Sequence, residues 1–174
     1  MCEKNDVVYR EAIGNDAFGL LTHIASVGAE TDNLSYNQNT FNISEERERR
    51  FIERFEKSQI DAMFVALVGE LVVGNAIVER NRIARYKHRA EISITVLKEF
   101  WGRGIGSHLM QMMIDFAKET GVEILQLEVR GDNARAISLY KRYGFSRVGT
   151  FENFFKIGSE YYSADLMILN LKKI

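Results

Sequence analysis

The sequence contains no proline and only one cysteine, Cys2, among its 174 residues. A single cysteine cannot form an internal disulfide, so we expect a protein of the reducing cytoplasm rather than a disulfide-stabilised secreted domain. Cys2 lies so close to the chain end that we expect no catalytic role for it. No uncharged apolar run approaches the roughly 20 residues of a membrane span, and the first residues lack the apolar core of a signal peptide.

An excess of charge of one sign is also missing, because 23 basic and 24 acidic side chains give a formal net charge of -1. This balance predicts no general attraction to nucleic acid or to an anionic membrane, so any anionic ligand must be held by a local arrangement. The charged run at 45–50 mixes both signs and precedes an apolar stripe, which is typical of a solvated helix face. No His, Cys, Asp and Glu set has the spacing of metal ligands, and we predict no metal.

No internal repeat, low-complexity tract or linker interrupts the chain, so we expect a single domain over residues 1–174. Hydrophobic periodicity and turn residues predict an order of elements. The predicted strands are 7–10, 63–68, 71–78, 88–97, 124–129, 145–155 and 161–169, the predicted helices are 15–27, one after Ser44, one from 106 to Gly121, and 133–143, and 30–42 is a loop. The strands 88–97 and 124–129 flank a helix and should be parallel, with a right-handed crossover. The fold class is therefore α/β (α+β), with a mixed central sheet that is antiparallel in its N-terminal part and flanked by helices.

The most informative segment is a glycine-rich turn, Trp-Gly-Arg-Gly-Ile-Gly at 101–106, between an alternating strand and an amphipathic helix. Unpaired N–H groups and the macrodipole at such a helix start can hold a pyrophosphate without a basic patch. Gly102, Gly104 and Gly106 permit positive φ and close approach of phosphate oxygens, and Arg103 could add a charge-assisted contact. Taken alone, the turn is also compatible with a structural turn that binds nothing. A dinucleotide fingerprint is disfavoured because its third glycine is missing.

A second motif occupies 133–145, with the sequence Asn-Ala-Arg-Ala-Ile-Ser-Leu-Tyr-Lys-Arg-Tyr-Gly-Phe. Together the two motifs resemble the GNAT superfamily of N-acetyltransferases, most closely its bacterial small-molecule acetyltransferases. In that family a Q/R-x-x-G-x-G/A turn binds the coenzyme pyrophosphate, and an Asn-x-x-Ala-x-x-x-Tyr-x-x-x-Gly-Phe helix follows about one strand later. The residues in register are Gly104, Gly106, Asn133, Ala136, Tyr140, Gly144 and Phe145. Trp101 departs from the pattern, since it replaces Gln or Arg, but the backbone donors remain.

The resemblance implies that acetyl-CoA is the acyl donor and that the acetyl group passes by direct attack to a primary amine of a small molecule. The splayed ends of strands 88–97 and 124–129 would form the parallel pair at the cofactor slot. Main-chain groups of one strand would pair with the pantetheine amides, as an added strand does. The cofactor-binding residues implied are Ile94, Thr95, Val96, Gly102, Arg103, Gly104, Ile105, Gly106, Ser107, Asn133 and Tyr140.

Acetyl transfer to an amine needs a proton donor for the leaving thiolate and a proton acceptor for the amine. Tyr140 is the candidate acid, because a phenol with a pKa of about 10 can protonate a thiolate whose pKa is about 8.5. Glu91 is the first candidate base, and Glu30 is a second choice that alternatively binds the ammonium group of the substrate. Each has a structural alternative: Tyr140 as a packing residue, and the two carboxylates as ordinary solvated or ion-paired groups.

Several questions stay open at the level of sequence. The acceptor is alternatively a protein N-terminus or lysine, and a non-catalytic CoA-binding sensor would have the same fold. The acceptor pocket is expected from the weakly patterned segments 30–42 and 149–162. The resemblance also allows a homodimer, whereas nothing in the sequence points to a nucleic-acid or membrane partner.

Overall fold

The computed structural model describes residues 6–37 and 43–172, so Cys2 lies outside the described residues. The elements follow the predicted order, with boundaries that differ by a few residues. They are β1 (Val8–Glu11), η1 (Gly14–Asp16), α1 (Ala17–Glu30), α2 (Glu45–Glu56), β2 (Ala62–Val68), β3 (Leu71–Arg80), β4 (Arg89–Val96), η2 (Lys98–Phe100), α3 (Ile105–Glu119), β5 (Ile124–Arg130), α4 (Ala134–Arg142), β6 (Ser146–Ile157) and β7 (Glu160–Asn170). No helix in the described ranges is long and apolar enough to cross a membrane.

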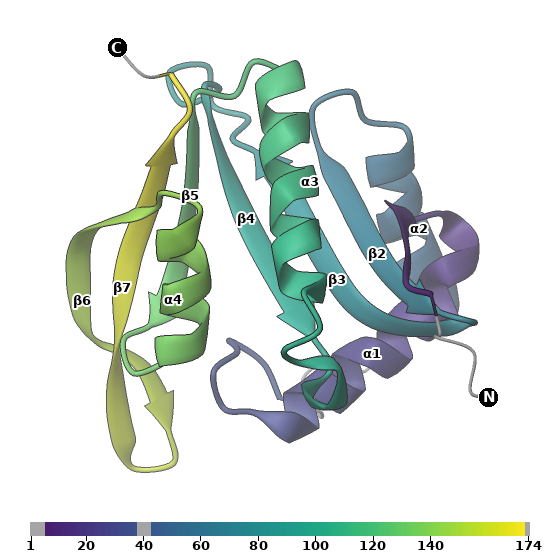
Figure 1. Ribbon diagram of the computed structural model, residues 1–174, viewed down its shortest axis with the longest axis horizontal. Helices are drawn as coiled ribbons and strands as arrows, with labels where there is room; N and C mark the ends of the chain where they lie inside the picture. Colours follow the sequence, from purple (N-terminus) through teal and green to yellow (C-terminus); the bar gives the residue numbers. More distant parts are fainter. Residues whose placement is uncertain (1–5, 38–42, 173–174) are drawn as a thin grey trace.

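The strands form one seven-stranded sheet in the order β1-β2-β3-β4-β5-β7-β6 (Figure 1). Every neighbouring pair is antiparallel except β4 and β5, which are parallel. The structure therefore confirms the predicted mixed sheet with its parallel pair. The pairing between β4 and β5 is short, because only Arg89–Glu91 pairs with Ile124–Gln126. Beyond Glu91 the two strands diverge, and Figure 1 shows α4 and the end of α1 on either side of the gap.

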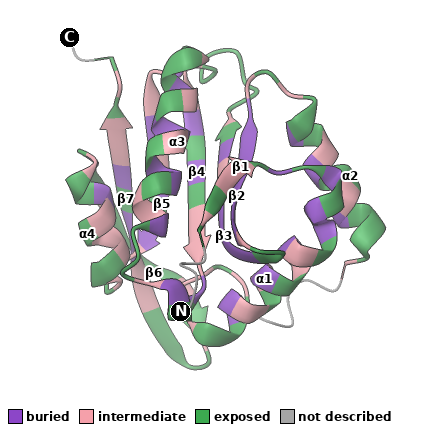
Figure 2. Cartoon of the chain, turned by 45° about the vertical axis from the view of Figure 1, so that its right-hand side comes forward, coloured by how far each residue is buried: buried purple, intermediate pink, exposed green. Residues whose placement is uncertain are grey.

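Two apolar cores lie on opposite faces of the sheet. Alternate residues of β2 point to opposite sides, which explains why nearly the whole strand is buried. Met63 and Val65 pack with α1 and α2, whereas Phe64 and Ala66 belong to the larger core beneath α3. In Figure 2 the side of α3 toward the sheet is mostly purple, as expected of an amphipathic helix. The two cores hold β3 and β4 firmly while one edge of β4 remains open.

The ends of several helices follow local sequence signals. Ser44 caps α2 through its hydroxyl, which accepts a hydrogen bond from the Arg47 amide. Gly121, with φ of 73°, follows the C-cap of α3, where a left-handed residue is favoured. One boundary needs correction, because α1 continues through Glu30, which we expected to begin a loop. Helical hydrogen bonding therefore fixes the backbone of Glu30, while residues 38–42 of the predicted loop lie outside the described ranges.

Candidate active site

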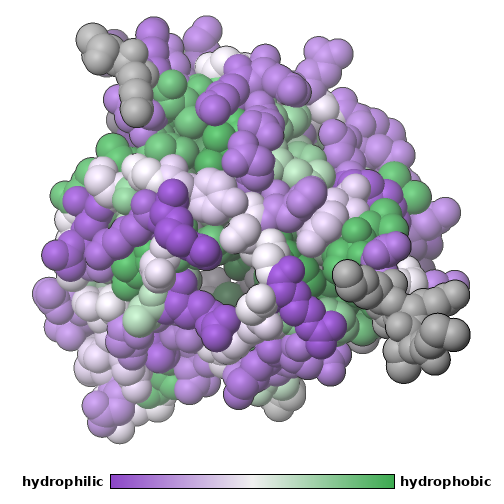
Figure 3. Space-filling model, viewed as in Figure 1, coloured by the Kyte–Doolittle hydropathy of each residue, from purple (hydrophilic) through white to green (hydrophobic). Residues whose placement is uncertain are grey.

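A cavity of about 580 Å³ opens where β4 and β5 diverge. Figure 3 shows a hollow near the middle of this face, with a hydrophilic rim and apolar atoms deeper inside. Its walls come from the end of α1 and the segment after it, the end of β4, the start of α3, the end of β5 and α4. The lining residues that bear on the chemistry are Glu30, Asn33, Ile94, Thr95, Val96, Trp101, Gly102, Gly104, Ile105, Gly106, Ser107, Arg130, Asn133, Arg135 and Tyr140.

The open edge of β4 offers main-chain hydrogen-bonding groups to the cavity. The Leu97 amide donates to the Val73 carbonyl, and in an antiparallel pair the direction of these groups alternates along the strand. Thr95 therefore pairs with Asn75 of β3, whereas the main-chain groups of Ile94 and Val96 point toward the gap. Trp101 Nε1 lies 2.8 Å from the Val96 carbonyl oxygen and donates to it. Of the main-chain groups predicted to contact the pantetheine, those of Ile94 and the Val96 amide are therefore available, whereas those of Thr95 and the Val96 carbonyl are already paired.

The start of α3 supplies a second set of backbone donors. Gly104 is its N-cap in the left-handed region, with φ of 83°, and the His108 amide closes the first helical turn onto the Gly104 carbonyl. The amides of the first helical residues, Ile105, Gly106 and Ser107, have no helical partner. A Cβ built on Gly102 or Gly104 would meet no atom within 4 Å, so the space above this turn is open.

Two details of this turn differ from the sequence-based expectation. Gly106 lies inside the first turn of α3 and does not use positive φ, unlike Gly102 and Gly104. The side chain of Arg103 turns away from the cavity, because its Nη2 donates to the Glu99 carbonyl at 3.2 Å and its guanidinium stacks on Phe100. Arg103 is absent from the cavity lining, so the structure gives no support to the expected charge-assisted contact from this side chain.

The helix α4 brings Asn133 and Tyr140 to the cavity. Asn133 is its N-cap, and its Oδ1 accepts a hydrogen bond from the Ala136 amide, which leaves the Nδ2 group for a ligand. Tyr140 is buried and packs against Phe145, and burial raises the pKa of its phenol to about 12. Its hydroxyl has no hydrogen-bond partner among the described residues. Tyr140 is therefore a protonated donor at neutral pH, and whether it acts in catalysis remains a prediction.

Glu91 lies at the closed end of the gap, since it is the last residue of β4 that pairs with β5. Its side chain is on the sheet face opposite to α3, and it does not line the cavity. Partial burial, followed by the nearby charges of Glu128 and Glu79, raises the pKa of the Glu91 carboxyl. Glu79 stands directly across from it on β3, a like-charge pairing that is unfavourable in a sheet.

The wall opposite α4 carries two polar groups, Glu30, which the sequence analysis singled out, and Asn33, which it did not. Glu30 lines the cavity, and its Oε2 accepts a hydrogen bond from the Lys98 amide at 2.9 Å. Asn33, three residues later, also lines the cavity, and its Oδ1 is buried without a partner among the described residues. Arg130 ties this segment to β5, because it donates to the Asp32 carbonyl at 3.0 Å while it forms an ion pair with Asp132.

The other segment expected to build the acceptor pocket does not reach the cavity. None of the residues 149–162 is among its lining residues, and Phe151 and Tyr161 are exposed on the hairpin of β6 and β7. Tyr162 contacts a lining residue, because the Arg130 guanidinium lies 4.4 Å from its ring centroid. Amphipathic patterning alone could not have separated this hairpin from the segment after α1, which does line the cavity.

The cavity fits the coenzyme in three respects. It has an open strand edge for amides, a turn with free space above two glycines, and unpaired helix amides for an anion. Within the described ranges, no group of His, Cys, Asp and Glu is arranged to hold a metal ion. The cavity can therefore bind a ligand that contains phosphate and amide groups, next to the protonated phenol of Tyr140.

Comparisons with known proteins agree with this geometry. The family model "Acetyltransferase (GNAT) family" matches residues 29–145. The L-amino acid N-acetyltransferase AaaT of Escherichia coli is 31% identical over 130 residues, which cover 74% of this chain and 80% of that protein.

Two solved structures share the fold along nearly the whole chain. A GNAT-family acetyltransferase from Streptococcus pneumoniae superposes with a TM-score of 0.91 at 26% identity, covering 95% of this chain and 99% of the other. The putative acetyltransferase yncA from Salmonella typhimurium, solved with its cofactor acetyl-CoA, gives a TM-score of 0.85 at 18% identity, covering 97% and 96%. The slot between β4 and β5, the family match and these likenesses lead to one conclusion: the chain belongs to the GNAT family and is an acetyl-CoA-dependent N-acetyltransferase.

Proposed function

We propose that residues 1–174 act as a single domain that transfers the acetyl group of acetyl-CoA to a primary amine of a small molecule by direct attack. The observation that carries this proposal is the pair of hydrogen-bond acceptors in the cavity wall, Glu30 and Asn33. The Asn33 Oδ1 atom is buried without a partner, and an unsatisfied buried acceptor is costly unless a ligand supplies a donor. An amine carries N–H donors, and an ammonium group also complements the Glu30 carboxylate.

The roles proposed for the other residues follow from their surroundings. When bound, acetyl-CoA supplies the activated acyl group, and the amides of Ile105, Gly106 and Ser107 hold its diphosphate. Glu91 takes the proton of the amine through water, since its side chain does not line the cavity, and its raised pKa brings it closer to the working pH of a general base. Tyr140 stays protonated at neutral pH and donates to the leaving sulfur.

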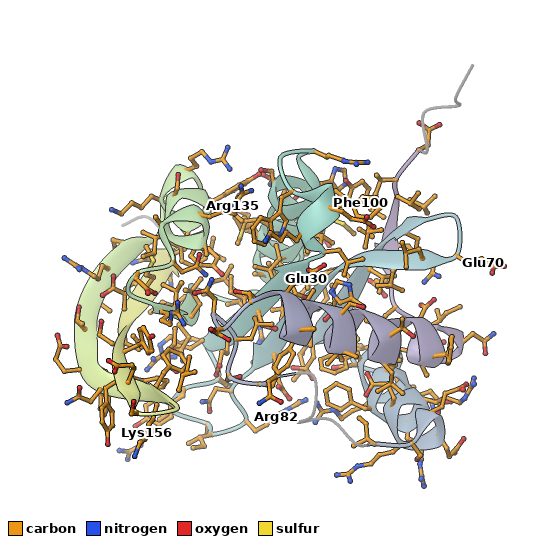
Figure 4. The ribbon with its side chains drawn as sticks, turned by 90° about the horizontal axis from the view of Figure 1, so that it is seen from below. Glu30, Glu70, Arg82, Phe100, Arg135 and Lys156 are labelled. Atoms are coloured by element: carbon orange, nitrogen blue, oxygen red, sulfur yellow. The ribbon has the colours of Figure 1, made fainter. Side chains whose placement is uncertain are left out.

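A small acceptor is favoured by the way the segment after α1 is held. Arg130 fastens the Asp32 carbonyl to the end of β5, so this segment stays close to the slot instead of opening toward a bulky substrate. In Figure 4, Glu30, Phe100 and Arg135 come from three different elements around the same opening. The similar protein from Escherichia coli acts on L-amino acids, and amino acids are therefore the first acceptors to test.

The proposal is tested by measuring release of free thiol from acetyl-CoA in the presence of three panels: L-amino acids, other small primary amines, and peptides with a free N-terminus or lysine. Saturable thiol release with a small amine, with the acetylated amine found by mass spectrometry, is the expected result. Turnover with peptides alone would overturn the small-molecule proposal and favour a protein acceptor. Coenzyme binding without turnover on any panel would overturn it in favour of the sensor.

We also propose that the protein forms a homodimer through the hairpin of β6 and β7. The strand β6 is a sheet edge of 12 residues and is exposed along most of its length (Figure 2). Val148 and Phe151 on this edge, and Tyr161 on the neighbouring strand β7, are exposed by more than half, and an edge with such side chains is prone to pair with another chain. Light scattering after size-exclusion chromatography is expected to give twice the chain mass, and the mass of a single chain would contradict the proposal.

A further inference from the structure

Trp101 has a fixed orientation at the mouth of the cavity. Its indole N–H donates to the Val96 carbonyl at the end of β4, which locks the ring beside the glycine-rich turn. Trp101 lines the cavity together with Gly102 and Gly104. This is the position at which the sequence departs from Q/R-x-x-G-x-G/A, so the segment lacks a charged or amide side chain there.

A cation reaches the same place from the other wall of the slot. The Arg135 guanidinium carbon lies 4.4 Å from the centroid of the Trp101 ring, a cation–π contact that spans the mouth of the cavity. Arg135 is the second residue of α4, and Figure 1 shows α4 and the segment before α3 on opposite sides of the gap. Its side chain forms no ion pair or hydrogen bond with any residue in the described ranges. A guanidinium has five N–H donors, and a ring face satisfies none of them by hydrogen bonding.

The position of α4 keeps Arg135 beside the helix amides that face an anion. Tyr143 Oη donates to the Ser107 carbonyl at 2.6 Å, which ties the end of α4 to the first turn of α3. Leu139, one turn after Arg135, packs over Gly106, where a Cβ would lie 3.5 Å from its Cδ2. Arg103, by contrast, is held away from this place by Glu99 and Phe100.

We propose that the Arg135 side chain binds a phosphate group of coenzyme A, and that Trp101 is the positioning residue that holds its guanidinium at the cavity mouth. The positive charge that Arg103 does not bring to the cavity is thereby supplied from α4. A guanidinium matches phosphate oxygens in a bidentate manner, which an ammonium or an amide does not. The inference rests on coenzyme binding alone and is independent of which amine accepts the acetyl group.

Titration calorimetry with coenzyme A tests the role of Arg135 without requiring turnover. Arg135→Gln is expected to weaken the affinity about tenfold, as for loss of one charge-assisted contact. Lys141→Gln removes one positive charge from the same helix but lies outside the cavity lining, and it is expected to change the affinity less than about twofold. Arg135 is exposed, so its substitution should leave the fold intact, and circular dichroism of both variants checks this.

The role of Trp101 is tested by a measurement that substitution of a purely structural residue would not change. Trp101→Leu should weaken coenzyme binding to a similar extent as Arg135→Gln, and the double variant should bind no worse than either single variant within about twofold, because the two side chains act as a unit. Trp101→Phe keeps an aromatic face and should restore the affinity to within about threefold of wild type. Raising the salt concentration should weaken binding less steeply in Arg135→Gln than in wild type.

Dephospho-coenzyme A, which lacks the 3′-phosphate, identifies the group that is bound. If Arg135→Gln still weakens its binding, the diphosphate is the partner. If the difference disappears, the 3′-phosphate is the partner, and either result supports a phosphate contact. Equal affinity of wild type and Arg135→Gln for coenzyme A, or equal weakening by Lys141→Gln, would overturn the inference. Failure of wild type itself to bind coenzyme A would instead remove the proposed function.

Discussion

The buried imidazole of His23 in α1 accepts a hydrogen bond from the hydroxyl of Thr95, a residue of the cavity wall. Its Nδ1 lies 3.0 Å from the Val72 carbonyl oxygen, which can only accept, so Nδ1 carries the proton and Nε2 is left as the acceptor. The Nε2 to Thr95 Oγ1 distance is 2.9 Å. A neutral histidine thus connects α1 to Val72 of β3 and to Thr95 of the cavity wall.

Stability should depend on pH through this residue. Burial lowers the pKa of His23 from 6.5 to about 4 in the folded protein, so the unfolded chain binds the proton more readily. The contribution of His23 is therefore complete above pH 6.5 and is lost as the pH falls toward about 4, by an amount on the order of 3 kcal/mol. Urea unfolding of wild type across this range should show the loss.

His23→Gln provides the comparison, because glutamine does not titrate. This variant is expected to be less stable than wild type at pH 7 but to lose less stability between pH 6.5 and 4. Parallel pH profiles of the two proteins would show that other groups cause the acid sensitivity.

Tyr140→Phe should slow acetyl transfer about a hundredfold, within the range of general acid catalysis, while the affinity for coenzyme A stays within about twofold. Phenylalanine keeps the packing against Phe145, so the fold should be retained. Because burial raises the pKa of Tyr140 to about 12, this residue should cause no loss of wild-type activity up to about pH 11. Steady-state kinetics and calorimetry on the same preparation measure the two effects, and equal turnover would remove Tyr140 from the mechanism.

The sequence predicted the parts of the site that depend on local backbone patterns. The glycine turn and the helix after it follow from signals a few residues long, and the parallel pair of β4 and β5 follows from the crossover rule. Prediction from the sequence failed where side chains from elements far apart in the chain contact one another. Nothing near Arg103 indicates that its guanidinium stacks on Phe100, and nothing near Arg135 indicates that Trp101 lies across the slot. Asn33 went unnoticed because an unpaired buried atom is a property of tertiary packing.

Glu91→Gln should have opposite effects on activity and stability. If Glu91 is the base, kcat should fall strongly near neutral pH, because the amide cannot accept a proton. The folded protein raises the pKa of Glu91 above its ordinary value of 4.5, so its ionised form is unfavourable in the fold. Glutamine removes the repulsion with Glu79 and Glu128, and Tm at pH 7 should rise by about 1–2 °C.

The sign of that stability effect gives an internal control. The pKa of the Glu91 carboxyl is higher in the folded protein than in the unfolded chain, so its ionisation destabilises the fold as the pH rises from 4.5 through the folded pKa. At a pH where the carboxyl is protonated in both states, it has no such effect. The gain in Tm of Glu91→Gln should therefore vanish below about pH 4.5. A variant with wild-type kcat and a raised Tm would show Glu91 to be an ordinary surface carboxylate.

Gly104→Ala and Gly106→Ala separate backbone strain from crowding in the turn before α3. Gly104 has φ of 83°, where alanine costs about 1–2 kcal/mol, whereas Gly106 is helical and an added Cβ would make only ordinary contact with Leu139. Gly104→Ala should therefore lower Tm by roughly 2–8 °C, and Gly106→Ala should change it much less. Thermal unfolding monitored by circular dichroism distinguishes the two, and equal losses would mean that crowding dominates.

Asn33→Leu should weaken use of the amine and leave use of the coenzyme nearly unchanged. Leucine fills a similar volume but has no acceptor atom, so the KM for the amine should rise about tenfold while the KM for acetyl-CoA changes less than about twofold. Because the Asn33 Oδ1 atom is buried without a partner, its removal should not lower Tm. Ser35→Ala, an exposed change in the same segment, serves as the matched control.

Asn33→Asp makes the test sharper, because it keeps an acceptor oxygen at the same place and adds a negative charge. If an ammonium group approaches this wall, the aspartate variant should retain a KM for the amine within about threefold of wild type, in contrast to the leucine variant. A rise in the KM for acetyl-CoA with an unchanged KM for the amine would mean that Asn33 faces the coenzyme. The acceptor would then have to bind on the face of the sheet that carries Glu91, and the segment after α1 would not contact it.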